Sequence, residues 1–238
     1  MERIDKLLAG TGRWSRKEVA ALIRAGRVTV EGKLVGSREE KYPDTAAVTV
    51  DEEPIAIQTY TYLMLHKPAG LVSATEDPRE KTVLSLLPEH LRRIGLFPAG
   101  RLDKDTVGLL LLTNDGPLAH ALLSPGRHVD KTYLVRVEGE LTGEDEKAFR
   151  EGITLADGYR CLPAGLERLG PGEARVTLHE GKYHQIKRMC AARGKPVVFL
   201  KRLSFGPLAL DEALAPGQWR ELTGEELERL RMAGKGGH

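Results

Sequence analysis

The chain has 238 residues, of which 41% are hydrophobic, 29% are charged and only 5% are aromatic. This length accommodates one large domain or two unequal ones, and the apolar content excludes a disordered chain. A formal net charge of +2 does not by itself indicate a nucleic-acid partner, so the distribution of charge along the chain matters more.

The positions of the cysteines and the hydropathy of the chain exclude several classes of protein. Cys161 and Cys190 are far apart and form no CxxC pair, which excludes a disulfide framework and a cysteine zinc site. No apolar run approaches the roughly 18 residues of a membrane span, and the charged start, MERIDKLLAG, is unlike a signal peptide. We therefore expect a cytoplasmic monomer without membrane attachment.

The first part of the chain is predicted to be a small helix–helix–hairpin module. Leucine and isoleucine at i, i+3 and i+4 predict a helix over residues 2–10. A second helix is predicted over residues 16–24, because Ser15 and Glu18 form a capping box at its start. Alternation of apolar residues over 27–35 predicts a β-hairpin.

The pattern changes after Pro54, which places a domain boundary near residue 57. The predicted parts are an N-terminal domain (1–57), a larger domain (58–232) and a flexible tail (233–238). Within the larger domain, strands are expected at 60–67, 107–113, 131–139, 173–181 and 196–210, and helices at 82–88, 117–125, 143–152, 183–194 and 223–233. Because strands often follow one another directly, the sequence favours an α+β fold with a mixed, largely antiparallel sheet and flanking helices.

Basic residues gather around the second predicted helix. Residues 1–41 carry ten lysines and arginines against six acidic residues. Such a helix either binds nucleic-acid phosphates without sequence preference or has a basic face exposed to solvent. The charge pattern by itself favours the solvent-exposed face. The basic side chains concerned are Arg13, Arg16, Lys17, Arg24 and Arg27.

The segment RIDKLLAGTGRWSRKEVAALIRAGRVTVEGKLV resembles the S4 RNA-binding domain. The matching features are the leading R-x-D-K-x-L, the S-R that opens the second helix, and L-I-x-x-G-x-V-x-V-x-G. The resemblance implies binding to structured RNA through the basic helix and the nearby loop. It therefore favours RNA binding over a solvated face for this charge cluster.

A second basic cluster lies within residues 175–202, with eight basic residues against one acid, Glu180. This density predicts a concave site for an anionic ligand. Its basic members are Arg175, Lys182, Lys187, Arg188, Arg193, Lys195, Lys201 and Arg202.

Motifs for other chemistries are missing from the sequence. His179, Glu180 and His184 do not have H-E-x-x-H spacing, and a glycine interrupts the segment, which argues against a zinc hydrolase. The sequence lacks a Walker loop, a G-x-S-x-G elbow and a strand followed by G-x-G-x-x-G. We therefore expect no metal, nucleotide or redox cofactor.

The stretch GRLDKDTVGLLLLTNDG carries three aspartates around an apolar run. Asp115 lies in a turn sequence. For Asp103 and Asp105, the residue types alone favour structural roles in a turn or a helix cap. The functional alternative is a metal site formed by the two carboxylates.

This stretch resembles the central signature of RsuA/RluB-type bacterial ribosomal-RNA pseudouridine synthases. Further motifs of that family match in order: HKPAGLVSA, KTYLVRVEG, EGKYHQIKRM, LKRLSFGPLAL and LAPGQWRELTGEE. Together with the S4-like domain, the resemblance covers nearly the whole chain. It implies an enzyme that isomerises uridine in RNA by breaking the C1′–N1 bond and joining C1′ to C5, without a cofactor.

The resemblance implies roles for particular residues. Asp103 is the expected catalytic aspartate, acting as nucleophile or as base. Lys187 is its expected basic partner, and the alternative role for Lys187 is a contact to an RNA phosphate. Tyr133 is expected to stack on the target base. Without the family resemblance, a tyrosine on this strand would be expected to be part of the core. Arg101 is expected to fill the gap left by a flipped base, and Leu200 to form a pocket wall.

The late motif also implies substrate contacts from His184, Gln185 and Arg188. Its form, EGKYHQIKRM, is closer to the small-subunit members of the family, so 16S ribosomal RNA, free or in an assembly intermediate, is the expected partner. The alternatives are a large-subunit (23S) enzyme of the same family, a non-catalytic ribosome-assembly factor, and a metal-dependent RNA hydrolase that uses Asp103 and Asp105.

Overall fold

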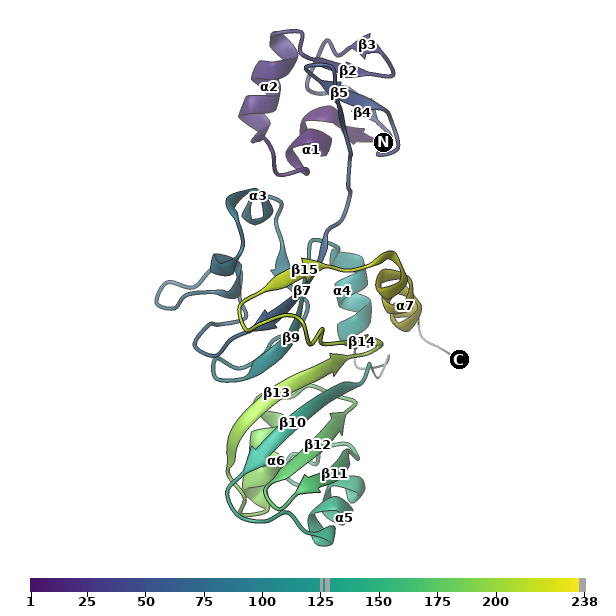
Figure 1. Cartoon of the computed structure of the whole chain (residues 1–238). Helices are drawn as coiled ribbons and strands as arrows, with labels where there is room; N and C mark the ends of the chain where they lie inside the picture. Colours follow the sequence, from purple (N-terminus) through teal and green to yellow (C-terminus); the bar gives the residue numbers. More distant parts are fainter. Residues whose placement is uncertain (125, 127–128, 236–238) are drawn as a thin grey trace. The chain divides into compact units, whose positions relative to one another are not determined.

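The computed structural model describes residues 1–124, 126 and 129–235, which form two compact units (Figure 1). One unit contains Met1–Thr61 and Leu84–Phe97, and the other contains Tyr62–Val83 and the described residues from Pro98 onward. The grouping of residues 84–97 with the N-terminal module is not anticipated by the sequence, and the boundary at residue 57 stays a prediction.

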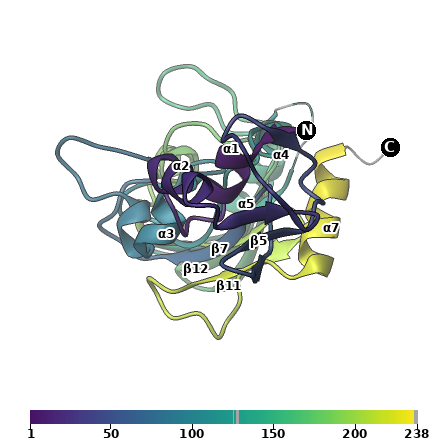
Figure 2. The same ribbon diagram turned by 90° about the horizontal axis from the view of Figure 1, so that it is seen from above.

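The helical part of the first unit follows the sequence closely. A two-residue strand, β1 (Glu2–Arg3), leads into α1 (Ile4–Ala9), and α2 (Arg16–Arg24) has the predicted bounds. Ser15 accepts a hydrogen bond from the Glu18 amide, and the Glu18 carboxylate accepts one from the Ser15 amide, so the capping box is confirmed. Figures 1 and 2 show α1 and α2 side by side.

A small antiparallel sheet completes this module, with strand order β3-β2-β5-β6. The predicted hairpin is confirmed, because Glu31 and Gly32 both adopt the positive φ of a tight type I′ turn. Strand bounds are β2 (Val28–Val30), β3 (Lys33–Leu34), β5 (Val48–Val50) and β6 (Glu53–Ile55), while β4 (Lys41–Tyr42) pairs with β1. Valines of β2 and β5 pack against apolar residues of both helices and form the core.

The second unit is built on a mixed sheet with the order β11-β12-β10-β13-β9-β7-β15. The strands are β7 (Tyr62–Lys67), β8 (Phe97–Pro98), β9 (Val107–Thr113), β10 (Lys131–Val137), β11 (Gly165–Gly170), β12 (Glu173–Leu178), β13 (Val197–Phe205), β14 (Leu208–Ala209) and β15 (Trp219–Glu221). Neighbouring strands along this order are antiparallel except β9 and β13, which pair in parallel. The predicted fold class, a mixed and largely antiparallel sheet with flanking helices, is confirmed.

The parallel contact between β9 and β13 depends on a glycine. Gly108 has φ near +105° and lies opposite Arg202 in the register. A Cβ at this position would lie 2.2 Å from the carbonyl oxygen of Arg202, which is far inside van der Waals contact. Only glycine lets the two backbones approach this closely.

The remaining helices are η1 (Val83–Leu86), α3 (Glu89–Arg92), α4 (Gly116–Leu123), α5 (Gly143–Glu151), α6 (Gln185–Ala192) and α7 (Gly224–Lys235). The short helix predicted over residues 82–88 is a 3₁₀ helix over residues 83–86. Asp115 is the N-cap of α4 and also accepts a hydrogen bond from the Tyr62 hydroxyl, so it does more than the predicted turn role.

The last helix, α7, packs on α4 (Figures 1 and 2). Thr223 caps the start of this helix, since its hydroxyl accepts a hydrogen bond from the amide of Glu226. Residues 233–235 of the predicted tail belong to this helix, and residues 236–238 lie outside the described residues. Among the helices described, none is long and apolar enough to cross a membrane.

Candidate active site

A buried lysine holds the loop that carries Asp103. The Lys67 side chain, at the end of β7, is fully buried. Its ammonium donates hydrogen bonds to the carbonyl oxygens of Pro68, Asp103, Lys104 and Thr106 at 2.9–3.2 Å. These contacts tie the loop between β8 and β9 to the end of β7.

Burial lowers the pKa of the Lys67 ammonium to about 8, although the carboxylates of Asp105 and Asp103 oppose this shift. Lys67 therefore remains mostly protonated at neutral pH, and its hydrogen bonds to the loop are charge-assisted. The buried Ser73 hydroxyl adds a second anchor, because it donates to the Leu102 carbonyl and accepts from the Leu102 amide. Asp103 thus lies on a loop fixed through its backbone.

The Asp103 carboxylate is partly accessible and faces two basic side chains. Its side chain is 24% exposed, and one oxygen, Oδ2, lies 3.0 Å from Nζ of Lys187. The other oxygen, Oδ1, lies 3.5 Å from Nε2 of His184. Lys187 also pairs with Asp105, so one ammonium bridges the two carboxylates of the loop. The predicted neighbours Asp103, Lys187 and His184 are therefore brought together.

Ion pairing shifts the pKa values of Asp105 and Lys187 in this cluster. The hydrogen bond from Lys187 lowers the pKa of Asp105. Burial opposes the charged form of Lys187, but the hydrogen bonds to Asp105 and Asp103 outweigh it and raise its pKa. The lysine is consequently a fixed cation, and it favours the ionised form of Asp105.

Lys187 is aimed at Asp103 by the way α6 packs. Ile186, Met189 and Cys190 are buried, which fixes the orientation of the helix, and α6 contacts β13. Gln185 is 4% exposed, and its side chain bonds to the Lys182 amide and to the Glu180 carboxylate of its own loop. The structure gives Gln185 a bracing position rather than a free substrate-facing one.

Tyr133 and Leu200 lie on one face of the sheet. In the register of β10 and β13, Tyr133 is opposite Arg202 and Val135 is opposite Leu200, so these side chains point to the same side. Tyr133 is 9% exposed and Leu200 is 7% exposed. Since Arg202 also pairs with Gly108 of β9, Tyr133 lies two strands away from the strand that follows the Asp103 loop. No hydrogen bond joins Tyr133 to Asp103 in the described part of the chain.

Two other predicted substrate contacts differ in their availability. Arg188 forms an ion pair with Asp157. Arg101 is exposed, and its side chain has no ion pair among the residues that the structure describes. Arg101 is therefore free to meet a ligand, whereas Arg188 would have to leave Asp157.

The anionic-ligand site predicted over residues 175–202 stays a prediction, and acids outside this segment pair with several of its basic residues. Arg193 and Lys195 both pair with the fully buried Asp145 of α5, and Arg175 pairs with Glu167. The Arg202 side chain is buried, donates to the Leu109 carbonyl and lies over the Phe205 ring. Lys187 remains the member directed at the candidate site.

The first unit contains a basic pocket of about 440 Å³ along α2. Its basic lining residues are Arg16, Lys17, Arg24 and Arg38. Arg38 was not singled out by the sequence, because it lies in a loop far from α2 along the chain. Arg27, which was predicted to bind RNA, instead forms a bidentate ion pair with Asp51, and Arg13 is exposed outside the pocket lining.

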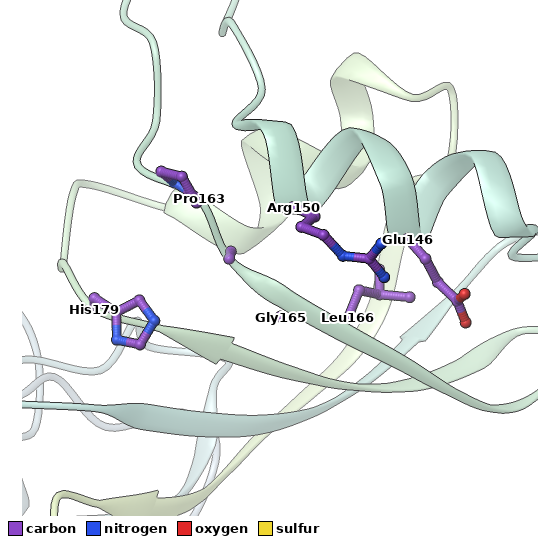
Figure 3. Close-up of a pocket in the computed structure, with 7 residues that line it drawn as sticks. Glu146, Arg150, Pro163, Gly165, Leu166 and His179 are labelled. Carbon is purple, nitrogen blue, oxygen red and sulfur yellow. The ribbon is translucent and has the colours of Figure 1, made fainter.

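A second pocket, of about 240 Å³, lies between α5 and β11 (Figure 3). Figure 3 shows Arg150 and Glu146 on the helix and His179 at the other end of the pocket. His179 also pairs with Asp130 at 2.6 Å. None of the residues that contact Asp103 lines this pocket. No group of three His, Cys, Asp or Glu side chains suited to a metal ion occurs in the described residues.

Comparison with known proteins identifies the family. A family model described as RNA pseudouridylate synthase matches residues 61–192, and an S4 domain model matches residues 2–41. The chain belongs to the RNA pseudouridine synthase family. The predicted resemblance, including the S4 domain, is confirmed.

Similar proteins cover almost the full length of this pseudouridine synthase. An "Uncharacterized RNA pseudouridine synthase YtzG" of Bacillus subtilis is 51% identical and matches 96% of this chain and 98% of that protein. "Ribosomal small subunit pseudouridine synthase A" of Escherichia coli is 42% identical, matching 94% and 98%. A crystal structure of a pseudouridylate synthase shares 37% identity with a TM-score of 0.69, covering 97% of this chain and all of the other.

Lys67 of this pseudouridine synthase, like Arg38, was not predicted from the sequence. The signal was present, because the HKPAG motif contains it, but its partners are carbonyl oxygens of the Asp103 loop. Backbone acceptors exist at every position of a chain, so a sequence cannot show which of them a lysine will reach.

Proposed function

We propose that this pseudouridine synthase isomerises a uridine in small-subunit ribosomal RNA and that Asp103 begins the reaction. The observation that carries the proposal is the Asp103 carboxylate, partly exposed, 3.0 Å from Lys187 and held on a loop anchored by Lys67. Similarity over nearly the whole chain to the small-subunit enzyme of Escherichia coli supports the choice of RNA.

The reaction requires an ionised carboxylate at Asp103, either to attack the nucleoside or to take a proton. Lys187 stabilises that charge. Once the C1′–N1 bond breaks, the uracil turns, C1′ joins C5, and the C5 proton is lost to solvent while N1 gains one. Atoms and electrons balance without an oxidant or reductant, and Tyr133 stacks on the turning base.

The target uridine must leave the base stack before Asp103 can reach it. Arg101 is placed two residues before Asp103 on the anchored loop and is exposed, which suits a side chain that enters the vacated stack. Leu200, on the same sheet face as Tyr133, supplies apolar surface for the uracil. The basic pocket on α2 binds the phosphate backbone of the RNA. The enzyme acts as a cytoplasmic monomer.

The test measures tritium release from C5-tritiated uridine in 16S transcripts, with 23S transcripts as the parallel substrate. We expect release from 16S RNA by the native chain in EDTA, and loss of at least about a thousandfold with Asp103→Asn, as for removal of a catalytic group. Cleavage of the RNA that EDTA abolishes, without tritium release, would instead support a metal-dependent hydrolase. Release from 23S RNA alone would move the substrate to the large subunit.

A further inference from the structure

Next to Asp103 lies an aromatic pair that the proposed chemistry does not use. The rings of Tyr183 and His184 are stacked, with centroids 3.8 Å apart and planes 17° from parallel. His184 in turn approaches the Asp103 carboxylate at 3.5 Å. The Tyr183 ring is therefore separated from the candidate catalytic group by a single side chain.

The backbone around this pair is held in an unusual shape. His184 has φ 48° and ψ 35°, in the left-handed region, which is uncommon for residues other than glycine although Asn, Asp and His adopt it most often among them. Neighbouring side chains of a strand point to opposite sides, and this conformation instead brings two successive rings face to face. Gln185 fixes the loop by bonding to the Lys182 amide and to the Glu180 carboxylate. The stack is thus built into the turn that starts α6.

The Tyr183 ring offers a free aromatic face. Tyr183 is 72% exposed although one face is covered by His184, in a chain with only 5% aromatic residues. Aromatic side chains that bind single-stranded RNA work in this way, because every base has a face that can stack. The ring is one side chain away from the Asp103 carboxylate, where the proposed reaction brings an RNA strand, and this favours a nucleobase over a protein side chain as its occupant.

We infer that Tyr183 and His184 form a stacking platform for an unpaired nucleobase adjacent to the target uridine. When the uridine flips out, its neighbour loses a stacking partner, which costs a few kcal/mol. The platform replaces that partner next to Asp103 and so holds the strand in the flipped state. This inference rests on the proposed function of Asp103, and it assigns Tyr183 a role in binding rather than in bond cleavage.

The first experiment measures steady-state tritium release from C5-labelled 16S transcripts. Tyr183→Ala is expected to lower kcat/KM by about 5- to 150-fold, the value of one base–aromatic stack. Tyr183→Phe keeps the ring and is expected to stay within about twofold of the native enzyme. Tyr60→Ala, which removes another exposed tyrosine, is the control and should have native activity. Native kcat/KM in Tyr183→Ala, or equal losses in the Ala and Phe variants, overturns the platform.

The second experiment needs no turnover. Tyr183→Trp places a fluorophore on the platform, and unlabelled 16S transcript is added while gel shift confirms that it binds. We expect quenching beyond that of the native protein, whose Trp14 and Trp219 set the background. Bound RNA without this extra quenching overturns the inference. Quenching in an enzyme that releases no tritium would instead reject the proposed function and leave the platform standing.

Discussion

Two lysines act on the same short loop, and they do so through different atoms. Lys67 holds the backbone carbonyls of residues 103, 104 and 106 from inside the protein. Lys187 meets the carboxylates of Asp103 and Asp105 from α6. The first lysine sets where Asp103 is, and the second forms an ion pair with its carboxylate. Of the two, only Lys67 has a pKa lowered toward the physiological range.

This difference predicts the alkaline limb of the pH profile. As pH rises through about 8, Lys67 loses its proton and keeps only two N–H groups for four carbonyl acceptors, so kcat should fall with the loss of one proton. Lys131, whose pKa burial also lowers to about 8, is the control: Lys131→Met should retain the limb. Lys67→Met should lose at least about tenfold in kcat at every pH, since the loop is no longer held. An unchanged alkaline limb in its residual activity would contradict the assignment.

The same shift has a consequence for stability, with the sign fixed by linkage. An unfolded lysine keeps its proton to about pH 10.4, whereas folded Lys67 loses it near pH 8. Between these values the unfolded chain binds more protons, so the Lys67 contribution to the free energy of unfolding increases with pH. Lys67 therefore makes the folded protein less stable below pH 8, where its charge is buried, than above about pH 10.

At the scale of elements, the sequence predicts features that depend on neighbouring residues, but it does not predict strand pairs and ion pairs between separate segments. The bounds of α2 and its capping box follow from residues within one helical turn, which the sequence displays. Strand β11 was not predicted, because GLERLG has glycine at both ends and is a strand only through pairing with β12. The family resemblance predicted that Asp103 and Lys187 lie close together. It did not predict which acids pair with Arg175, Arg193 and Lys195, because those acids lie outside residues 175–202.

The close approach of β9 and β13 gives a prediction for Gly108. Gly108→Ala should reduce the free energy of unfolding by at least about 3 kcal/mol, because the new Cβ meets backbone that cannot move aside. Gly194→Ala is the matched control: Gly194 also has positive φ, but a Cβ there meets nothing within 4 Å, so only about 1–2 kcal/mol of backbone strain is expected. Urea denaturation measures both, and equal losses would show that strain, not the strand contact, dominates.

At the scale of the whole molecule, RNA affinity and chemistry are assigned to different units. The basic pocket on α2 belongs to the first unit, and the residues around Asp103 belong to the second. Phosphate contacts contribute affinity that falls with salt, whereas the reacting groups determine the rate at saturation. Changes in the pocket should therefore separate the two quantities.

Lys17→Ala with Arg24→Ala should weaken binding to 16S transcripts and lower the slope of log affinity against log salt by about 1 for each phosphate that is no longer neutralised. Tritium release at saturating RNA should stay at the native kcat. Arg27→Ala is the comparison, since Asp51 already occupies that guanidinium and its effect on the slope should be smaller. Filter binding at several salt concentrations measures the slopes; a larger effect from Arg27 than from the pair would contradict the assigned pocket.

The parallel seam between β9 and β13 also determines when the site can exist. β7 and β9, which supply Lys67 and the Asp103 loop, form one antiparallel part of the sheet, and β10 to β13, on which α6 packs, form the other. The strands at the seam are far apart in the chain, so their pairing closes a long loop. A nascent chain emerging from the ribosome carries Asp103 long before β13 has been synthesised. The ion pair between Asp103 and Lys187 can therefore form only after both parts of the sheet have been synthesised.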